Sequence, residues 1–341
     1  MTGLGRRGFI LASAAGVALA AAGARAAPDP LAAVDPELRS ALPPTAASDL
    51  TLGIMDSPQR RSTYGRVLPS PAPQPVELHI PGPPGAPDVR ILTIDPPKGS
   101  APRPALLFIH GGGYVMGRAD GSVAVLQELA RDYGIYGVSV DYRLAPETRW
   151  PGSMEDNYAA LKWLASHAAE LGVDPARIAI GGASAGGGHA AMLAVAARDR
   201  GEVHVAFQVL IYPMLDDRTA SSRPASPDAG HFIWTPQDNR LGWQALLGRA
   251  PGGPGTPPGA APARVADLRG LPPAWIGVGN IDLFCLEDVD YARRLLLAGV
   301  PTELMVVPGA YHAFDGLAPN AAVSKAFTGE WQRALVKALR A

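Results

Sequence analysis

The sequence predicts an α/β fold built on one central, mostly parallel β-sheet. From residue 105 onward, short apolar runs alternate with amphipathic helical patterns, as expected when helices connect parallel strands. The runs are continuously apolar, which is typical of strands buried on both faces. The 39 glycines and 35 prolines lie among these periodic segments and indicate many tight connections. A chain of 341 residues suits one large domain that carries an insertion.

Residues 1–26 are interpreted as an export signal and are set apart from the fold. Arg6 and Arg7 precede an apolar stretch over residues 9–22, and the run ARA at 24–26 offers a cleavage site before Ala27. This stretch is shorter than the roughly 20 residues that span a bilayer, which favours a cleaved signal over a membrane anchor. We expect no stable membrane span in the mature chain. The run RRGFI resembles a twin-arginine signal, and an ordinary Sec signal is the alternative. Either route predicts an exported protein, periplasmic or secreted.

The first part of the mature chain, residues 27–75, is rich in proline, alanine and polar residues, with helical periodicity only around 31–42. Two alternating runs follow, VELHI at 76–80 and VRILTI at 89–94, and the turn-forming PGPPGAP separates them. This pattern predicts a β-hairpin with a long loop.

The remaining elements follow the alternation of strands and helices. Strands are predicted at 105–109, 135–140, 177–180, 205–212, 274–279 and 303–307, and helices at 122–133, 153–171, 189–200 and 286–299. Residues 213–265 interrupt this order with a polar segment, a helical pattern at 236–248 and a low-complexity run. We expect an insertion there, over the carboxyl ends of the strands, where open α/β sheets bind ligands.

Composition excludes several classes of function. The formal net charge of −1 and the lack of a basic block argue against a nucleic-acid partner. The single cysteine, Cys285, excludes an internal disulfide and a cysteine-rich metal site. The sequence predicts no particular oligomeric state.

The run GASAG at 182–186 fits the G-x-S-x-G pattern of a nucleophile elbow around Ser184. It lies between the predicted strand at 177–180 and a helix expected to start near Gly187. A serine on so tight a turn needs small neighbours, and the following helix points its N–H groups at the reacting centre. The alternatives are a chance match in a Gly/Ala-rich segment and a phosphate-binding loop. The second alternative fails because Gly187 stands where a lysine is needed.

A second glycine motif, His110-Gly111-Gly112-Gly113, directly follows the predicted strand at 105–109. Consecutive glycines let backbone N–H groups approach a ligand oxygen, and HGGG is the oxyanion-loop motif of lipases and esterases. His110 is interpreted as locking this loop, not as transferring protons. By itself the motif is also compatible with a flexible turn.

An acid and a base are expected where two later strands end. Asp282 follows the predicted strand at 274–279, and His312 follows the strand at 303–307. The chain order Ser184, Asp282, His312 is the one expected for a nucleophile elbow on such a sheet. Because the carboxyl ends of parallel strands share one edge, these three residues are predicted to converge.

Other titratable residues are weaker candidates. His189 lies five residues beyond Ser184 along the helix and is interpreted as packing, so His189→Ala is expected to change activity little. Three further histidines are interpreted as structural: His79, His167 and His204. Glu287 and Asp288 are expected to complement the N-terminal dipole of their helix. Asp216 and Asp217 remain minor alternatives to Asp282.

Together these motifs resemble the hormone-sensitive-lipase-like branch of the α/β-hydrolases, the bacterial carboxylesterases. The resemblance covers residues 105–340, and the motifs that carry it are HGGG at 110–113, DYRLAPE at 141–147, SAGG at 184–187, YP at 212–213, Asp282 followed by Glu287, and YARRL before AGVPTEL. It implies an α/β-hydrolase fold whose core comprises residues 76–212 and 266–341. A helical lid would come from the N-terminal segment, 27–75, and the insertion, 213–265.

The resemblance also implies a serine carboxylesterase that acts on small to medium acyl esters and needs no metal or cofactor. Ser184 would attack the ester, His312 would transfer the proton, and Asp282 would orient the imidazole. The oxyanion would be bound by backbone N–H groups, with the preceding residues as loop support: Gly112, Gly113 and Ala185, supported by His110 and Gly111. The chain departs from the family at Ala183, where an aspartate is usual, and at Cys285 and Leu286.

Two other functions are compatible with these residues. The same machinery serves an amidase, a peptidase or a polysaccharide deacetylase. A hydrolase-fold protein that binds a ligand without turnover is the second alternative. Loss of the nucleophile or the base would mark such a binder, whereas Ser184 and His312 are both present.

Overall fold

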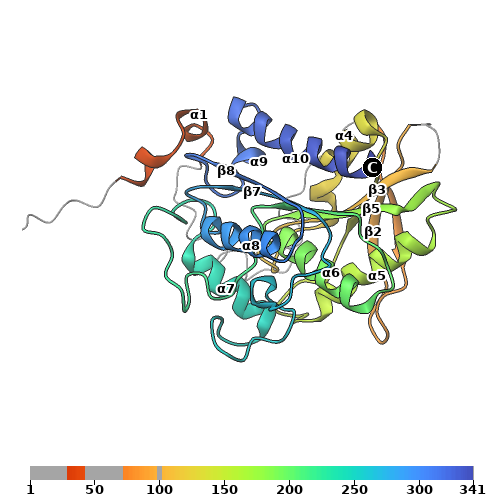
Figure 1. Cartoon of the computed structure of the whole chain (residues 1–341), viewed down its shortest axis with the longest axis horizontal. Helices are drawn as coiled ribbons and strands as arrows, with labels where there is room; N and C mark the ends of the chain where they lie inside the picture. Colours follow the sequence, from red (N-terminus) through yellow and green to blue (C-terminus); the bar gives the residue numbers. More distant parts are fainter. Residues whose placement is uncertain (1–28, 43–71, 98–101, 341) are drawn as a thin grey trace, which may run out of the picture.

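The computed structural model of the chain describes residues 29–42, 72–97 and 102–340. Its centre is an eight-stranded sheet in the order β1-β2-β4-β3-β5-β6-β7-β8 (Figure 1). Only the β1–β2 and β2–β4 pairs are antiparallel. The predicted mostly parallel sheet and the hairpin are therefore confirmed.

Three predicted strands have the bounds that the apolar pattern indicated: β1 (Val76–Ile80), β2 (Val89–Ile94) and β7 (Ala274–Gly279). The others differ by a few residues: β3 (Arg103–Ile109), β4 (Tyr136–Val140), β5 (Val173–Ala183), β6 (Phe207–Ile211) and β8 (Thr302–Val307). The largest difference is in β5, which begins four residues early because Val173 pairs with Arg103 before a register shift.

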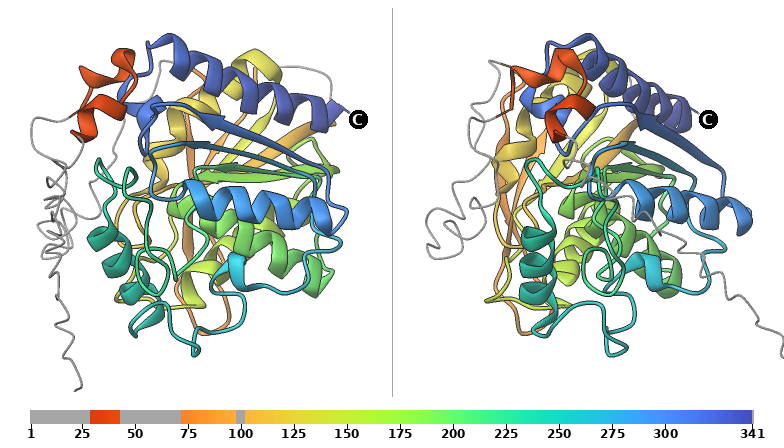
Figure 2. Two further views of the ribbon diagram at one scale, coloured as in Figure 1. Left: turned by 60° about the vertical axis from the view of Figure 1, so that its left-hand side comes forward. Right: turned by 90° about the vertical axis from the view of Figure 1, so that its left-hand side faces the viewer.

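Helices cover both faces of the sheet (Figure 2). On one face lie α4 (Val123–Tyr133) and α10 (Ala322–Arg340), and on the other lie α5 (Gly152–Ser166), α6 (Ala185–Arg200) and α8 (Cys285–Leu297). The strands supply both cores, because successive residues point to opposite faces. Leu106 and Phe108 pack on the side of α4 and α10, whereas Leu107 and Ile109 pack on the side of α6.

Several predicted helix ends differ from the structure, and α8 ends at Leu297, two residues before the predicted end. The helix expected over 153–171 ends at Ser166, where His167 caps it and residues 167–172 form a turn. The helix expected to start near Gly187 begins at Ala185, because Ser184 itself is its N-cap residue. Only Ser184 therefore separates the end of β5 at Ala183 from the start of α6.

The segment 213–265 contains one long helix, α7 (Pro236–Leu247), and a short turn of 3-10 helix, η4 (Pro262–Arg264). Thr235 and Asp238 cap α7 reciprocally, and Gly248 ends it with a left-handed φ of 67°. In Figure 2 this segment, drawn in green to teal, lies beside the sheet edge at which β6 and β7 end.

The N-terminal segment is described only over 29–42, and the rest of the predicted lid segment and the predicted export signal lie outside the described residues. Two short helices form there, η1 (Pro30–Ala33) and α1 (Pro36–Arg39), since Asp35 and Pro36 interrupt the periodicity. The Asp35 N–H donates to the Gly309 carbonyl, and the Tyr311 hydroxyl donates to the Leu38 carbonyl. This segment therefore packs on the loop that follows β8.

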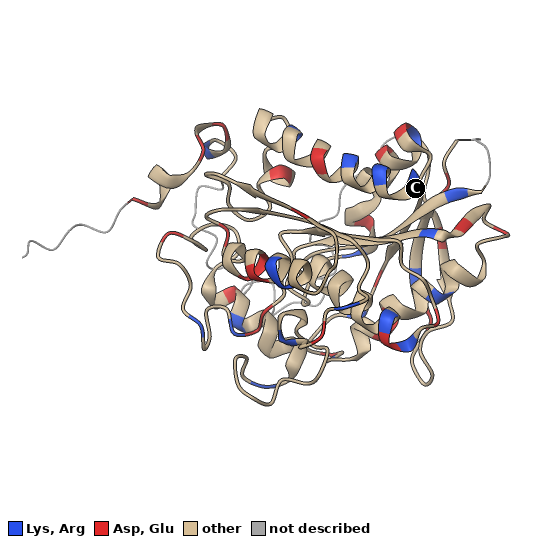
Figure 3. Cartoon of the chain, viewed as in Figure 1, with Lys and Arg blue, Asp and Glu red and all other residues tan. Residues whose placement is uncertain are grey.

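Charged residues of both signs are interspersed over the described elements (Figure 3). Among the described helices, none combines the length and the apolar character needed to cross a bilayer.

Candidate active site

Ser184 lies on a strained turn between β5 and α6. Its backbone has φ 58° and ψ −124°, a left-handed conformation that is costly for a residue with a side chain. The Ser184 N–H donates to the Ile211 carbonyl at 2.9 Å, which ties the turn to the neighbouring strand. A Cβ on Gly182 would lie 2.5 Å from the Gly186 backbone, and one on Gly186 would lie 2.0 Å from the Ile109 carbonyl oxygen. The two glycines of the motif are therefore required by close backbone contacts.

This crowding leads to a stability prediction for Gly186→Ala. Alanine normally favours a helix by about 1 kcal/mol over glycine, but here its methyl group would collide with the Ile109 carbonyl. We expect the free energy of unfolding to fall by about 2 kcal/mol or more, measured by urea denaturation. The matched control is Gly329→Ala in the exposed part of α10, where nothing lies within 4 Å, and it should gain about 1 kcal/mol. Equal shifts in the two variants would contradict the role of the contact.

His312 and Asp282 join Ser184 in a hydrogen-bonded chain. His312 Nε2 lies 2.9 Å from Ser184 Oγ, and His312 Nδ1 lies 2.8 Å from Asp282 Oδ2. An ionised carboxylate only accepts, so Nδ1–H donates to Asp282, and Nε2 accepts from the serine hydroxyl. Ser184 is 8% exposed, Asp282 is 1% exposed and His312 is 4% exposed. This burial keeps bulk water from competing for the hydrogen bonds. The predicted nucleophile, base and acid therefore lie within hydrogen-bond distance of one another.

Packing and backbone contacts hold Asp282 and His312 in place. Asp282 Oδ1 accepts from the Phe284 N–H at 2.9 Å, which orients the carboxylate. Phe284 and Tyr212 make T-shaped contacts with the imidazole of His312, with ring centroids 5.2 and 4.9 Å away. The Tyr212 hydroxyl in turn donates to Asp315 at 2.8 Å. Aromatic packing thus restricts the orientation of the imidazole, and its two nitrogens are hydrogen-bonded to Asp282 and Ser184.

The glycine motif that follows β3 forms a loop beside Ser184. Gly112 and Gly113 have φ values of 117° and 59°, so side chains are disfavoured at both positions. A Cβ on Gly111 would also lie 2.9 Å from the Ala183 carbonyl oxygen, which leaves no room for a larger residue. Ala185 opens α6, and the N–H groups of a first helical turn have no partner within the helix. The backbone amides predicted to bind an oxyanion therefore border the serine.

His110 and Tyr142 stabilise this loop. His110 Nδ1 lies 2.8 Å from the Gly111 carbonyl oxygen, and its ring stacks on Tyr142 at a centroid distance of 4.2 Å. The Tyr142 hydroxyl donates to the His110 carbonyl at 3.0 Å. Burial lowers the pKa of His110, so the neutral ring is favoured. These contacts agree with a supporting position for His110.

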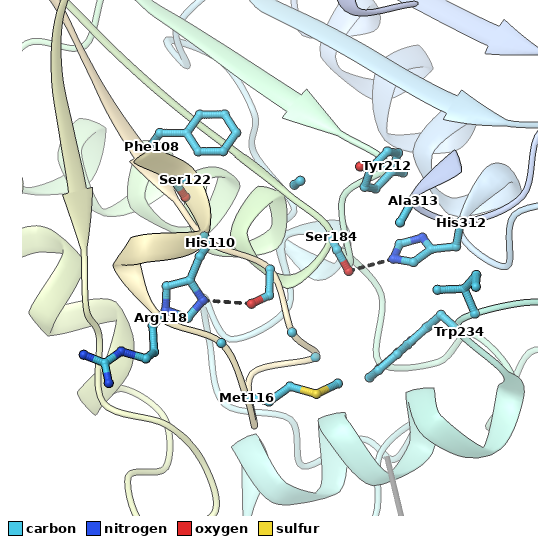
Figure 4. Close-up of a pocket in the computed structure, with 17 residues that line it drawn as sticks. Phe108, His110, Met116, Arg118, Ser122, Ser184, Tyr212, Trp234, His312 and Ala313 are labelled. Carbon is cyan, nitrogen blue, oxygen red and sulfur yellow. Dashed lines mark hydrogen bonds between the residues drawn. The ribbon is translucent and has the colours of Figure 1, made fainter. Parts of the chain in front are cut away.

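The serine opens into a cavity of about 240 Å³ (Figure 4). Its lining comes from the glycine loop, the elbow, the 3-10 turn η3 (Ala119–Ser122) before α4, the insertion, and residues at or after the ends of β3, β6 and β8: Phe108, His110, Gly111, Gly112, Gly113, Met116, Gly117, Arg118, Gly121, Ser122, Ala183, Ser184, Tyr212, Ile233, Trp234, His312 and Ala313. Trp234 and Met116 were not among the residues predicted from the sequence. The only signal for Trp234 was its position just before the cap of the helix predicted at 236–248.

His189 is not part of the cavity lining. It is fully buried, and its ring meets the edges or faces of Tyr114 and Tyr142 at centroid distances of 4.9 and 4.7 Å. Burial lowers the pKa of His189 to about 3, so the ring stays neutral at physiological pH. His189 is therefore a packing residue, as predicted.

The competing carboxylates are engaged elsewhere. Asp216 pairs with Arg218 and Arg223, and Asp217 pairs with Arg264. Glu287 does more than complement its helix dipole, because its Oε1 accepts from the Leu215 and Asp216 N–H groups at 2.6 and 3.1 Å. It thereby anchors the chain that leaves β6 to α8. The dipole interpretation of Glu287 was incomplete, because no local pattern reveals a contact across more than 70 residues.

Asp288 leads to a pH-dependent prediction. It is fully buried, and its carboxyl oxygens have no hydrogen-bond partner among the described residues. Desolvation, with the nearby Glu287 carboxyl, raises the pKa of Asp288 well above its ordinary value. The folded state therefore keeps a proton that the unfolded state loses above about pH 4. As the pH rises, the free energy of unfolding of the wild type should therefore fall relative to that of Asp288→Asn. The expected slope is up to about 1.4 kcal/mol per pH unit.

The measurement is chemical denaturation of wild type and Asp288→Asn at several values between pH 4 and pH 8. The asparagine variant should gain in relative stability as the pH rises. A difference between the two proteins that does not change with pH would contradict a protonated Asp288 in the folded state.

A buried serine–histidine–aspartate chain on a mostly parallel sheet, beside a glycine loop, is the arrangement of the serine hydrolases of α/β type. A family model described as "alpha/beta hydrolase fold" matches residues 106–316, and the chain belongs to this family. The resemblance to its hormone-sensitive-lipase-like branch is confirmed by the relatives.

Those relatives cover most of the chain. Carboxylesterase NlhH of Mycobacterium tuberculosis is 36% identical over 258 residues, which make up 75% of this chain and 81% of NlhH. Esterase LipI of the same organism is 37% identical over 246 residues, 71% of this chain and 75% of LipI. Among solved structures, a bacterial heroin esterase has a TM-score of 0.82 at 39% identity, with 91% of this chain and 99% of that chain covered.

Proposed function

We propose that this carboxylic ester hydrolase cleaves small to medium acyl esters through Ser184, His312 and Asp282, with a covalent acyl-enzyme intermediate. The observation that carries the proposal is the hydrogen-bonded chain from Ser184 Oγ through the imidazole to Asp282, with distances of 2.9 and 2.8 Å. The esterase relatives support the class of reaction.

In the first half of the proposed reaction, Ser184 Oγ attacks the ester carbonyl carbon while His312 Nε2 takes the hydroxyl proton. The carbonyl oxygen becomes negatively charged and is bound by the N–H groups of Gly112, Gly113 and Ala185. The bond to the leaving oxygen then breaks, and His312 gives its proton to the departing alcohol. Asp282 stabilises the imidazolium that forms between these steps.

In the second half, a water molecule attacks the acyl-serine carbonyl, and His312 takes a proton from that water. The same three N–H groups bind the second oxyanion. Collapse of the intermediate releases the carboxylic acid and returns the proton to Ser184 Oγ. Proton transfer by one positioned imidazole thus serves both halves of the reaction.

The size and the lining of the cavity support small to medium substrates. Its volume of about 240 Å³ lies below the roughly 300–1,000 Å³ of sites for drug-sized ligands. Phe108, Met116, Ile233 and Trp234 supply apolar walls that suit an acyl chain or an apolar alcohol. Rates on matched p-nitrophenyl ester and anilide substrates separate an esterase from an amidase, and we expect ester cleavage to be much faster.

A fluorophosphonate probe tests the proposed nucleophile directly. The probe should label the protein once, and peptide mapping should locate the phosphonate on Ser184. Heat-denatured protein is the control and should not react, because the reactivity depends on the assembled site. An intact, folded protein that is not labelled at Ser184 would exclude the proposed mechanism and favour a non-catalytic binder.

We further propose that residues 1–26 direct export, with Arg6 and Arg7 as part of a twin-arginine signal. The support is the sequence pattern alone, since these residues lie outside the described part of the chain. The exported protein should begin at Ala27. Replacement of both arginines by lysine should retain the precursor inside the cell, whereas unchanged export would favour a Sec signal.

A further inference from the structure

Trp234 lies at the point where the insertion meets the catalytic cavity. It directly precedes Thr235, the N-cap residue of α7, and the residue is 4% exposed. Figure 4 shows the indole extending from beside His312 toward Met116 and the glycine loop. The indole and imidazole centroids are 6.5 Å apart. A large, rigid side chain from the insertion thus forms one wall of the site.

The indole lies directly against the glycine loop. A Cβ on Gly113 would lie 2.0 Å from Trp234 Cη2, so the ring occupies the space that a side chain on this glycine would need. Trp234 therefore leaves no room beside Gly113 in which a substrate chain could extend. The backbone of α7 lies behind the ring, since a Cβ on Gly242 would lie 2.7 Å from the Gly113 carbonyl oxygen and 3.4 Å from Trp234 Cζ2.

Several contacts fix the orientation of the indole. Trp234 Nε1 donates to Asn239 Oδ1 at 3.3 Å, and Asn239 Nδ2 donates to the Thr219 carbonyl at 2.8 Å. The reciprocal cap between Thr235 and Asp238 holds the start of α7, where Trp234 is attached. The ring is therefore held at its nitrogen and through its backbone, and these contacts favour the orientation in which it lies against the glycine loop.

We propose that Trp234 is a specificity-determining residue that closes one arm of the substrate cavity and restricts that arm to short groups. This arm is the part of the cavity that extends from Ser184 along the glycine loop toward Trp234. It holds either the acyl chain or the alcohol of the ester, since both groups are apolar. The inference rests on the proposed ester hydrolysis at Ser184. It assigns substrate selection to the insertion, whereas Ser184, His312 and Asp282 supply the chemistry.

The test is the substrate profile of Trp234→Ala. One series of p-nitrophenyl esters varies the acyl chain from acetate to decanoate, and one series of acetate esters varies the alcohol from ethyl to octyl. Burial of one methylene is worth about fourfold in a binding constant, so two newly accommodated methylenes should contribute about tenfold or more. We expect the ratio of kcat/KM for long over short substrates to rise by at least about tenfold in one of the two series. The series in which it rises identifies the arm.

Two further variants keep the result interpretable. Trp234→Phe retains an aromatic ring without the second ring of the indole, and it should give a smaller shift in the same series. Phe232→Ala alters the same segment, but this ring packs toward Tyr311 and is not part of the cavity lining, so the ratio should not change. Because the readout is a ratio, a general loss of activity does not affect it.

An active Trp234→Ala enzyme with the wild-type profile in both series would overturn the inference and leave the proposed nucleophile untouched. If the alanine variant does not fold, an unchanged profile in Trp234→Phe would overturn it instead. Failure of the proposed function would look different, because Ser184→Ala would then hydrolyse these esters at the wild-type rate.

Discussion

Ser184→Ala is expected to lower kcat for p-nitrophenyl acetate by a factor on the order of 10⁶. The alanine cannot form the acyl intermediate, and His312 Nε2 loses the hydroxyl that lies 2.9 Å away. The remaining backbone amides near the site can still stabilise an oxyanion, so a trace of hydrolysis above the uncatalysed rate should persist. Steady-state kinetics with highly purified variant protein measure the loss, since contamination by wild type sets the detection limit.

The control for this experiment is His189→Leu. His189 is the histidine nearest to Ser184 in the sequence, but it is fully buried between Tyr114 and Tyr142. Leucine keeps most of the packing volume, and the structure therefore favours it over alanine as the replacement. We expect kcat to stay within about one order of magnitude of wild type. Wild-type turnover in Ser184→Ala would show that the nucleophile lies elsewhere.

Asp282→Asn is expected to lower kcat by a factor of about 10⁴ while leaving the fold intact. Asparagine has nearly the same shape as aspartate, so the packing around residue 282 is preserved. Its neutral amide cannot stabilise the imidazolium, and its amide nitrogen can donate to His312 Nδ1. Donation of that kind favours the wrong tautomer of His312, with the proton on Nε2. The measurement is kcat on a short-chain p-nitrophenyl ester, with circular dichroism to verify the fold.

The matched control is Asp216→Asn. Asp216 is as buried as Asp282 and follows a neighbouring strand, but it pairs with Arg218 and Arg223. Its replacement should reduce stability, because two arginines lose their partner, and kcat should change far less than in Asp282→Asn. A larger loss of kcat in Asp216→Asn than in Asp282→Asn would show that the catalytic acid follows β6 and not β7.

The sequence predicted the sheet well, because the signals for buried strands are local. The apolar runs at 89–94 and 274–279 became β2 and β7 with the same bounds. The two glycine motifs were equally readable, since a tight turn excludes larger side chains whatever surrounds it. Helix ends were less accurate: the start of α6 at Ala185 depends on the strained backbone of Ser184, which no periodicity encodes.

Distances between residues remote in the sequence were decided by the tertiary structure. The order of strands in the sheet brings His312 within 2.9 Å of Ser184, although 128 residues separate them, whereas His189 is held away among aromatic rings. The contacts of Glu287 with the chain after β6 and of Trp234 with Gly113 have the same origin. Local sequence determines turns, strands and the reactive motifs, because these depend on short-range sterics and on which side chains avoid water. Which side chains meet in the cavity depends on how the whole sheet and its insertion pack together.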